Sequence, residues 1–189
     1  MAAGGARLLD DEVEAEFRGR ERFETAGEVG EVLGNLEVLA AGDAAAYLVA
    51  RSFGVRRLEE ASLEVGQALV LSNLLTFGMK SAVRRERPDG SDELSFPSGH
   101  ASSSFAAATV VDAAFGHRAG ALAFVLAAWT AASRLEEHKH FLSDVVAGAG
   151  LGVVCGRAVV LGDRQGRSDR RRGAAFHLSP DRLIVSLRF

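Results

Sequence analysis

The sequence predicts an all-α fold, an antiparallel bundle of about five to six helices. Two features of the 189-residue chain support this fold class: it has only three prolines, and the stretches between its turn signals are rich in alanine, leucine and valine. The hydrophobic share of 48% and the charged share of 25% are typical of a folded protein. At this length we expect one domain with a substantial core.

The expected elements follow in order along the chain. Residues 1–32 form an acidic amphipathic segment, and residues 33–162 form the helical bundle. The bundle helices are expected near residues 33–52, 61–82, 99–116, 119–135 and 141–161. The turn-forming cluster at residues 88–91, followed by Pro97, predicts a loop between the second and third of these helices.

The last apolar helix carries a glycine repeat. Gly148, Gly152 and Gly156 recur every fourth residue, which places them on one helix face where a neighbouring backbone can approach closely. Cys155 lies in the same apolar run and is the only cysteine, so we expect a buried structural thiol and no internal disulfide.

Residues 163–189 are interpreted as a basic linker and a C-terminal tail. Arginines at 164, 167 and 170–172 are expected to be solvated, with contact to anionic lipid as the alternative. Residues 183–189 alternate apolar and polar side chains, as a strand does. The tail allows a short β-hairpin in which this strand pairs with residues 174–178 across 179–182.

Charge and targeting signals exclude some classes of protein. The net charge is −3, from 22 basic and 25 acidic residues, which argues against a nucleic-acid partner. The first 17 residues are acidic and lack a basic start followed by an apolar stretch, so a secretory signal is not expected.

Helices that alternate in direction bring every second connection to the same end of a bundle. One end then collects Lys80, Arg87, His100, Arg134, His140 and Asp144. The other end collects Arg51, Arg56, Arg57, Arg118 and the arginines after residue 162. The side chains suited to catalysis are therefore predicted at a single pole.

Three short segments carry this chemistry: Lys80-x6-Arg87-Pro88, Pro97-Ser98-Gly99-His100, and Ser133-Arg134-x5-His140-x3-Asp144. A transferring phosphoryl group spreads negative charge over its oxygens, so a catalyst without a metal needs fixed cations and amide donors around it. Lys80, Arg87 and Arg134 are the expected cations. Ser98 and Gly99 open a helix whose free N–H groups favour an anion.

The histidines of these segments have complementary roles. His140 and Asp144 are four residues apart, so on one helix face the carboxylate can accept the imidazole proton. A neutral ring nitrogen is then available as a nucleophile, and Asp144 stabilises the charge that develops on the ring. His100 can protonate a departing alkoxide and later accept a proton from water. This arrangement requires no metal and no other cofactor.

In spacing and order the three segments resemble the signature of the phosphatidic acid phosphatase type 2 and vanadium haloperoxidase superfamily. The signature spans residues 80–144, and the helical pattern extends the resemblance over about 33–161. The resemblance implies a phosphatase that forms a phosphohistidine on His140, with His100 as the acid of the Pro-Ser-Gly-His segment.

Two rival functions stay open. A pocket that holds a phosphate-like transition state also holds vanadate, so a vanadate-dependent haloperoxidase is the rival within the superfamily. A non-catalytic bundle that binds phospholipid or a protein is the rival from another class. His138 is interpreted as rim or surface, and Arg84, Arg85, His117 and His177 are left outside the predicted site.

The sequence points both ways about a membrane. The apolar runs at 119–132 and 145–162 are shorter than the roughly 20 residues that span hydrocarbon, and Asp43 and Arg157 would be costly in lipid. The arginines opposite the site fit a positive-inside arrangement. We therefore expect membrane association with an outward-facing site, with a soluble bundle as the alternative.

The expected substrate is a phosphorylated lipid, an isoprenyl diphosphate or a small soluble phosphomonoester. The chain defines neither the leaving group nor the oligomeric state.

Overall fold

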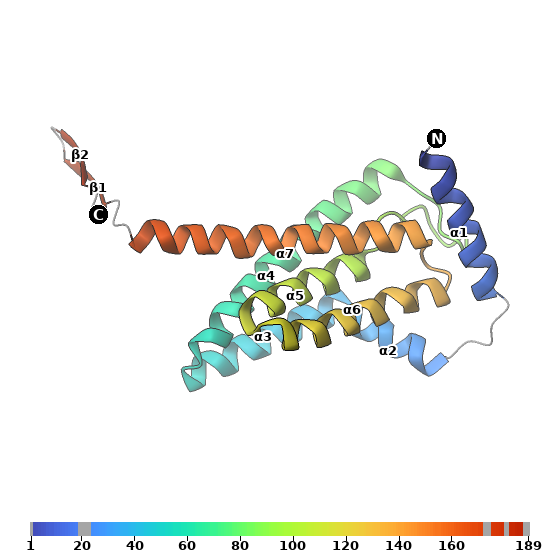
Figure 1. Ribbon diagram of the computed structural model, residues 1–189, viewed down its shortest axis with the longest axis horizontal. Helices are drawn as coiled ribbons and strands as arrows, with labels where there is room; N and C mark the ends of the chain where they lie inside the picture. The colour runs from blue at the N-terminus through green and yellow to red at the C-terminus, as the bar shows by residue number, and fades with distance from the viewer. Residues whose placement is uncertain (1, 19–23, 172–174, 180–181, 187–189) are drawn as a thin grey trace.

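The computed structural model describes residues 2–18, 24–171, 175–179 and 182–186 (Figure 1). These residues form seven α-helices and two β-strands. The elements are α1 Ala2–Arg18, α2 Glu24–Gly34, α3 Leu36–Phe53, α4 Arg56–Val83, α5 Gly99–Phe115, α6 His117–Glu136, α7 Leu142–Arg171, β1 Ala175–Ser179 and β2 Arg182–Ser186. The predicted all-α bundle is confirmed, although it has more helices than the five to six expected.

The additional helix arises at Asn35, which separates α2 from α3. Its side-chain oxygen accepts hydrogen bonds from the backbone N–H groups of Glu37 at 2.7 Å and Val38 at 3.4 Å, so Asn35 caps the start of α3. The chain bends by 57° at this break. The first predicted bundle helix therefore begins later than expected. The acidic N-terminal segment contains α1 and most of α2.

Helix α7 is longer than the sequence predicted. It continues to Arg171, past the end expected near residue 161, because no proline interrupts residues 162–171 and most of their side chains are compatible with a helix. Residues 163–171 thus extend the helix and do not form a linker. Arg172, also assigned to that linker, lies outside the described residues.

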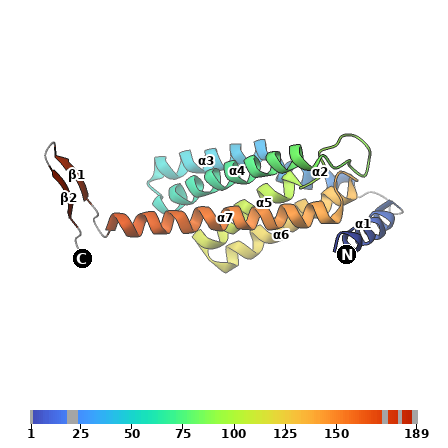
Figure 2. The same ribbon diagram turned by 90° about the horizontal axis from the view of Figure 1, so that it is seen from above.

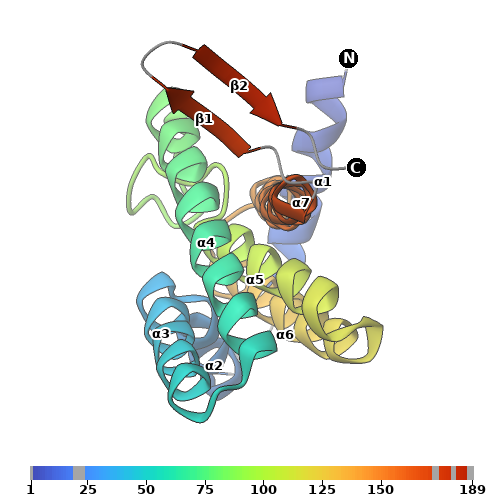
Figure 3. The same cartoon turned by 90° about the vertical axis from the view of Figure 1, so that its left-hand side faces the viewer.

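Helix α5 lies at the centre of the bundle, where it packs against α4, α6 and α7. Helix α3 packs on α4, α2 packs on α6, and α1 contacts α7 and α6. Figure 2 shows α1 beside the start of α7 and the hairpin beyond its end. Viewed along α7 in Figure 3, α3 and α4 lie on one side of α5 and α6 lies on the other.

The glycine repeat of α7 lets this helix contact the backbone of α5. A Cβ atom would lie 2.4 Å from the Ser98 carbonyl oxygen at Gly148 and 2.3 Å from the Ser102 carbonyl oxygen at Gly152. The predicted close approach of backbones is confirmed. Cys155, on the same helix, is buried, as predicted.

Small side chains fill the interior, while many large apolar side chains face outward. Alanine and serine dominate the buried positions, and Val110 is the largest fully buried side chain. Phe77 and Leu122 are each 70% exposed, and Val154 is 65% exposed. Small residues at helix contacts with large apolar residues outside are typical of helices that pack within a lipid bilayer.

One described helix segment, Leu142–Gly166, is long and apolar enough to cross a membrane, with a mean hydropathy of 1.9. The bent pair Glu28–Gly34 and Leu36–Phe53 also meets this criterion when taken together. The sequence interpretation that the apolar runs are too short was wrong for α7, because the helix extends beyond the run at 145–162 on both sides.

The predicted C-terminal hairpin is present. Strands β1 and β2 pair antiparallel, with Ala175 opposite Ser186 and Ser179 opposite Arg182. The strand partners are close to those expected from the alternating sequence. Residues 174 and 187–189, which the prediction included, lie outside the described residues.

Candidate active site

The predicted site residues meet at one end of the bundle, which we call the site pole. This pole consists of the C-terminal ends of α4 and α6, the N-terminal ends of α5 and α7, and the loops at residues 84–98 and 137–141. The opposite end, the far pole, contains the α3–α4 and α5–α6 connections and the C-terminal half of α7. Alternating helix directions account for this grouping.

His140 lies buried in the loop before α7, beside two cations. Its Nε2 atom is 3.4 Å from Arg87 Nη1, and because a guanidinium only donates, Nε2 accepts and Nδ1 carries the proton. Burial, followed by the charges of Lys80 and Arg87, lowers the pKa of His140 to about 2. The ring is therefore neutral near neutral pH, with the lone pair of Nε2 directed toward the cations.

Asp144, in the first turn of α7, is fully buried and has other partners than His140. Its Oδ1 accepts from Arg85 Nη1 at 2.7 Å, and its Oδ2 accepts from Ser95 Oγ at 2.5 Å and from the Phe141 N–H at 2.9 Å. The distance from Oδ2 to His140 Nδ1 is 3.9 Å, which is too long for a hydrogen bond.

The predicted hydrogen bond between His140 and Asp144 is thus not formed in this structure. The spacing argument placed both residues on one helix, but α7 begins at Leu142 and His140 precedes it. The Nδ1 atom of His140 is buried and makes no hydrogen bond of ordinary geometry, although the Ser95 backbone interacts with the ring and acts to raise its pKa. A small movement of the loop toward Asp144 would satisfy it.

Arg85 was left outside the predicted site, yet it contacts Asp144 directly. Its guanidinium carbon also lies 4.0 Å from the centre of the Phe141 ring, and its carbonyl accepts a hydrogen bond from the Ser95 N–H at 2.9 Å. Arg84 takes a left-handed conformation with φ of 48° at the end of α4, and the chain turns there. No short-range pattern distinguishes Arg85 from Arg84, because the partners of Arg85 lie 58 and 59 residues away.

The Pro-Ser-Gly-His segment opens α5 as predicted. The Ser98 hydroxyl accepts from the Ala101 N–H at 3.4 Å, and the Ser98 N–H donates to the Asp144 carbonyl at 2.9 Å. Ser98 is therefore a helix cap that fastens α5 to α7. Gly99 follows in the first turn, where helix N–H groups lack internal partners.

His100 lies under helix α2. A Cβ atom on Gly34 would be 2.9 Å from His100 Cδ2, so only glycine permits this contact. Burial, followed by the charges of Arg134 and Arg87, lowers the pKa of His100 to about 4. Its Nε2 atom is buried without a hydrogen-bond partner.

The three predicted cations all reach the pole, and each has a protein partner. The ammonium group of Lys80 donates to the Leu94 carbonyl. Burial, followed by the charge of Arg87, lowers the pKa of Lys80 to about 8. Arg87 pairs with Asp92 at 2.8 Å, and Arg134, which is 3% exposed, pairs with Glu137 at 2.7 Å.

His138, interpreted from the sequence as rim or surface, belongs to the loop between α6 and α7 at the site pole. It has a left-handed φ of 55°, is partly buried, and its Nδ1 atom has no hydrogen-bond partner. His117 lies at the far pole, and His177 belongs to β1. Among the described residues, no three His, Cys, Asp or Glu side chains cluster as metal ligands.

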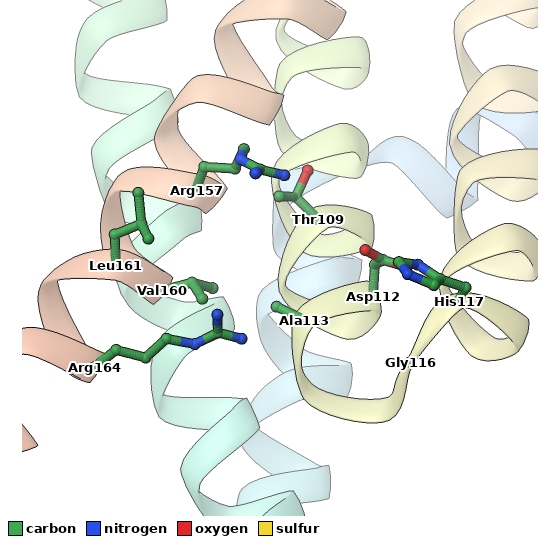
Figure 4. Close-up of a pocket in the computed structure, with 9 residues that line it drawn as sticks. All are labelled: Thr109, Asp112, Ala113, Gly116, His117, Arg157, Val160, Leu161 and Arg164. Atoms are coloured by element: carbon green, nitrogen blue, oxygen red, sulfur yellow. The ribbon is translucent and has the colours of Figure 1, made fainter.

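A separate cavity of about 360 Å³ lies at the far pole (Figure 4). It is bounded by α5, the start of α6 and α7, and its polar lining includes Thr109, Asp112, His117, Arg157 and Arg164. None of the predicted catalytic residues lines it. Its size therefore does not identify it as the reaction site, because the reactive groups gather at the opposite end.

Fold and site together define a helical protein that presents two neutral imidazoles and several cations at one pole. A site of this class is suited to bind phosphoryl groups. The chain belongs to the PAP2 superfamily, whose family model matches residues 61–166, more than half of the chain. This match contains all three sequence segments.

Three known proteins are similar to this chain. A lipid A 1-phosphatase of Porphyromonas gingivalis is 31% identical over 142 residues, which cover 71% of this chain and 32% of that protein. The chain thus spans about a third of the length of that relative.

Two solved structures share the fold. The crystal structure of LpxE from Aquifex aeolicus has a TM-score of 0.66 at 22% identity, over 81% of this chain and 94% of that one. A transmembrane PAP2-type phosphatidylglycerolphosphate phosphatase from Bacillus subtilis has a TM-score of 0.69 at 21% identity, over 85% of this chain and 87% of that one.

Proposed function

We propose that this chain hydrolyses phosphate monoesters of membrane lipids through a phosphohistidine on His140. One observation carries the proposal: the buried His140 and the partly buried His100, both with depressed pKa values, share the site pole with Lys80, Arg87 and Arg134. A neutral imidazole is the form that His140 requires as the nucleophile, and the cations supply the positive charge that holds a phosphoryl group.

In the first step Nε2 of His140 attacks phosphorus, and the bond from phosphorus to the ester oxygen breaks. His100 gives its proton to the departing oxygen, so the alcohol leaves neutral. In the second step water attacks the phosphohistidine, His100 takes a proton from that water, and inorganic phosphate and free His140 result. The dianionic phosphate in the site raises the pKa of His100 from about 4, so His100 takes up a proton from solvent when the substrate binds and donates this proton in the first step.

The two arginines have carboxylate partners that substrate phosphate would replace or share. Arg87 is held by Asp92, and Arg134 is held by Glu137. These contacts orient each guanidinium before substrate arrives, so less conformational entropy is lost on binding. Lys80 adds a compact charge next to Arg87.

Asp144 stabilises the positive charge that develops on the His140 ring. The ring and the carboxylate are 3.9 Å apart, and formation of the phosphohistidine leaves the Nδ1 proton more acidic. Closure of this gap would provide Nδ1 with a charged acceptor. We therefore expect the hydrogen bond to form as the reaction proceeds.

A lipid substrate is supported by the outward apolar faces of the bundle. Leu74, Phe77, Leu122, Val125 and Val154 are each more than 60% exposed, which suits a lipid environment better than water. The arginines of the far pole favour the cytoplasmic side, and the site pole would then face outward. The name of the Porphyromonas gingivalis relative, a phosphatase of lipid A, agrees with a lipid phosphate.

The test is a phosphate-release panel on the detergent-solubilised chain, with lipid phosphates, an isoprenyl diphosphate and a soluble monoester, all in the presence of chelator. His140→Ala is expected to reduce turnover at least about 10³-fold, because it removes the nucleophile. His117→Ala, a histidine 97% exposed at the far pole, is the matched control and should keep wild-type turnover. Undiminished hydrolysis by His140→Ala would refute the proposal. Halide oxidation with added vanadate and no phosphate release would favour the haloperoxidase.

A further inference from the structure

Helix α1 reaches the site pole through one buried carboxylate. Asp10 is 3% exposed, although it belongs to an acidic helix whose neighbouring residues are mostly exposed. Its Oδ1 accepts from the Ser143 N–H at 2.8 Å, and its Oδ2 accepts from Ser143 Oγ at 2.7 Å and Arg85 Nη2 at 2.9 Å. Both carboxylate oxygens are therefore occupied.

Asp10 is charged in this position. Burial raises its pKa, but the hydrogen bonds from Arg85 and Ser143 outweigh this effect, so the pKa of Asp10 lies below its ordinary value. A carboxylate beside the first N–H groups of α7 also interacts favourably with the helix dipole. The contact therefore caps α7 at the turn that carries Asp144.

Arg85 joins this carboxylate to the one beside His140. Its Nη1 donates to Asp144 Oδ1 and to Ser143 Oγ, both at 2.7 Å, while its Nη2 donates to Asp10. The planar guanidinium is thus fixed by contacts on two sides and by the Phe141 ring against its face. Because Arg85 holds Oδ1, the other oxygen of Asp144 stays on the side of His140.

We propose that Asp10 and Arg85 are positioning residues for the His140–Asp144 pair, so that helix α1 is part of the catalytic assembly. This inference rests on the proposed function and adds Asp10, which lies outside the three sequence segments, and Arg85, which occupies an unspecified position within the first of them. Asp10 orients Arg85 and Ser143, and Arg85 orients Asp144. The Asp144 carboxylate in turn lies 3.9 Å from the His140 ring. Loss of the Asp10 carboxylate would leave Arg85 Nη2 without its acceptor, so that Arg85 would hold Asp144 less firmly.

The first test compares Asp10→Asn with Asp11→Asn in the full chain. Both changes remove one charge from the same helix, but Asp11 is exposed. Asp10→Asn is expected to lower kcat about tenfold with KM within about twofold, because a misplaced catalytic group slows the reaction more than it weakens binding. Asp11→Asn should match the wild type. Equal values for Asp10→Asn and Asp11→Asn would overturn the inference.

The second test separates positioning from simple docking of α1. In an Asp144→Asn background, Asp10→Asn is expected to cost less than about twofold in kcat, because the residue through which Asp10 acts has already been changed. If α1 only stabilised the fold, Asp10→Asn would cost the same factor in both backgrounds. Arg85→Lys keeps the charge without the fork and should lower kcat, whereas Arg84→Lys should not.

A third measurement needs no turnover. The ¹⁵N NMR signals of the imidazoles, assigned with His140→Gln, report the hydrogen bonding of the His140 ring. Asp10→Asn should shift the His140 signals and leave those of His117 in place, while Asp11→Asn should shift neither. A shifted His140 signal in a chain without phosphatase activity would refute the proposed function and keep the positioning role. Unshifted His140 signals in both Asp10→Asn and Arg85→Lys would refute the positioning role alone.

Discussion

The two poles of the bundle place the same kinds of charged residue in different environments. At the site pole, Arg134 is 3% exposed and Asp144 is fully buried, and their neighbours include cations and a histidine. At the far pole, the Arg51 side chain is 66% exposed and pairs with Glu59 at 3.2 Å. Charges interact strongly where water is excluded and weakly where it is not. The site is therefore distinguished by desolvation, since both poles are rich in arginine.

Substitution of one arginine at each pole should give the largest difference in activity between the two poles. Arg87→Ala removes a cation beside His140 Nε2, and kcat/KM is expected to fall about 10²- to 10³-fold, the usual cost of losing a donor to a charged transition state. Arg157→Ala, in the far-pole cavity of Figure 4, should stay within about twofold. Initial-rate assays on a lipid phosphate measure both.

The contrast between the poles would fail if the two variants lost similar activity. It would also fail if Arg157→Ala lost more. Arg87 lies in a loop and Arg157 on an exposed helix face, so neither substitution is expected to disturb the helices. Circular dichroism of both variants checks this.

Much of the fold follows from local sequence. Proline scarcity, apolar stretches, the turn-forming cluster and the glycine repeat predicted the bundle, the loop between its second and third helices and a close backbone approach at α7, but not that α5 is the neighbour. The break at Asn35 and the continuation of α7 to Arg171 were missed, because one capping side chain and the absence of a helix breaker decide them. Both are weak signals beside a long apolar run.

The site was predictable where its residues belong to short spaced segments. Alternating helix directions were enough to bring Lys80, His100 and His140 to one pole. Asp10, Arg85 and Ser95 were missed because their contacts join segments 49 to 133 residues apart, and no local pattern records them. The 3.9 Å gap between His140 and Asp144 also depends on where α7 begins, which the four-residue spacing does not specify.

The middle of α7 offers a way to disturb the packing between the poles without changing their charges. Gly152→Ala would place a methyl group 2.3 Å from the Ser102 carbonyl oxygen of α5, and this backbone cannot move aside easily. We expect a loss of about 1–3 kcal/mol in the free energy of unfolding. Gly150→Ala, which meets nothing within 4 Å on the same helix, should raise stability by up to about 1 kcal/mol. Thermal unfolding in detergent compares the two, and equal midpoints would contradict the close contact.

The smallest expected effect is the pH dependence of activity, which tests whether desolvation at the site pole lowers the pKa of Lys80. Burial, and then the charge of Arg87, lowers the pKa of Lys80 from 10.5 to about 8, although Asp144 and Asp92 oppose the shift. Lys80 is therefore charged below pH 8 and becomes neutral above it, so kcat/KM, which reports the free enzyme, should decline about tenfold as pH rises through this value. Lys80→Arg keeps its charge at high pH and should lose this decline while its activity at pH 7 is reduced. A lysine as exposed to solvent as the far-pole Arg51 would keep its charge to about pH 10. A wild-type kcat/KM that stays constant up to that pH would therefore show that Lys80 is solvated.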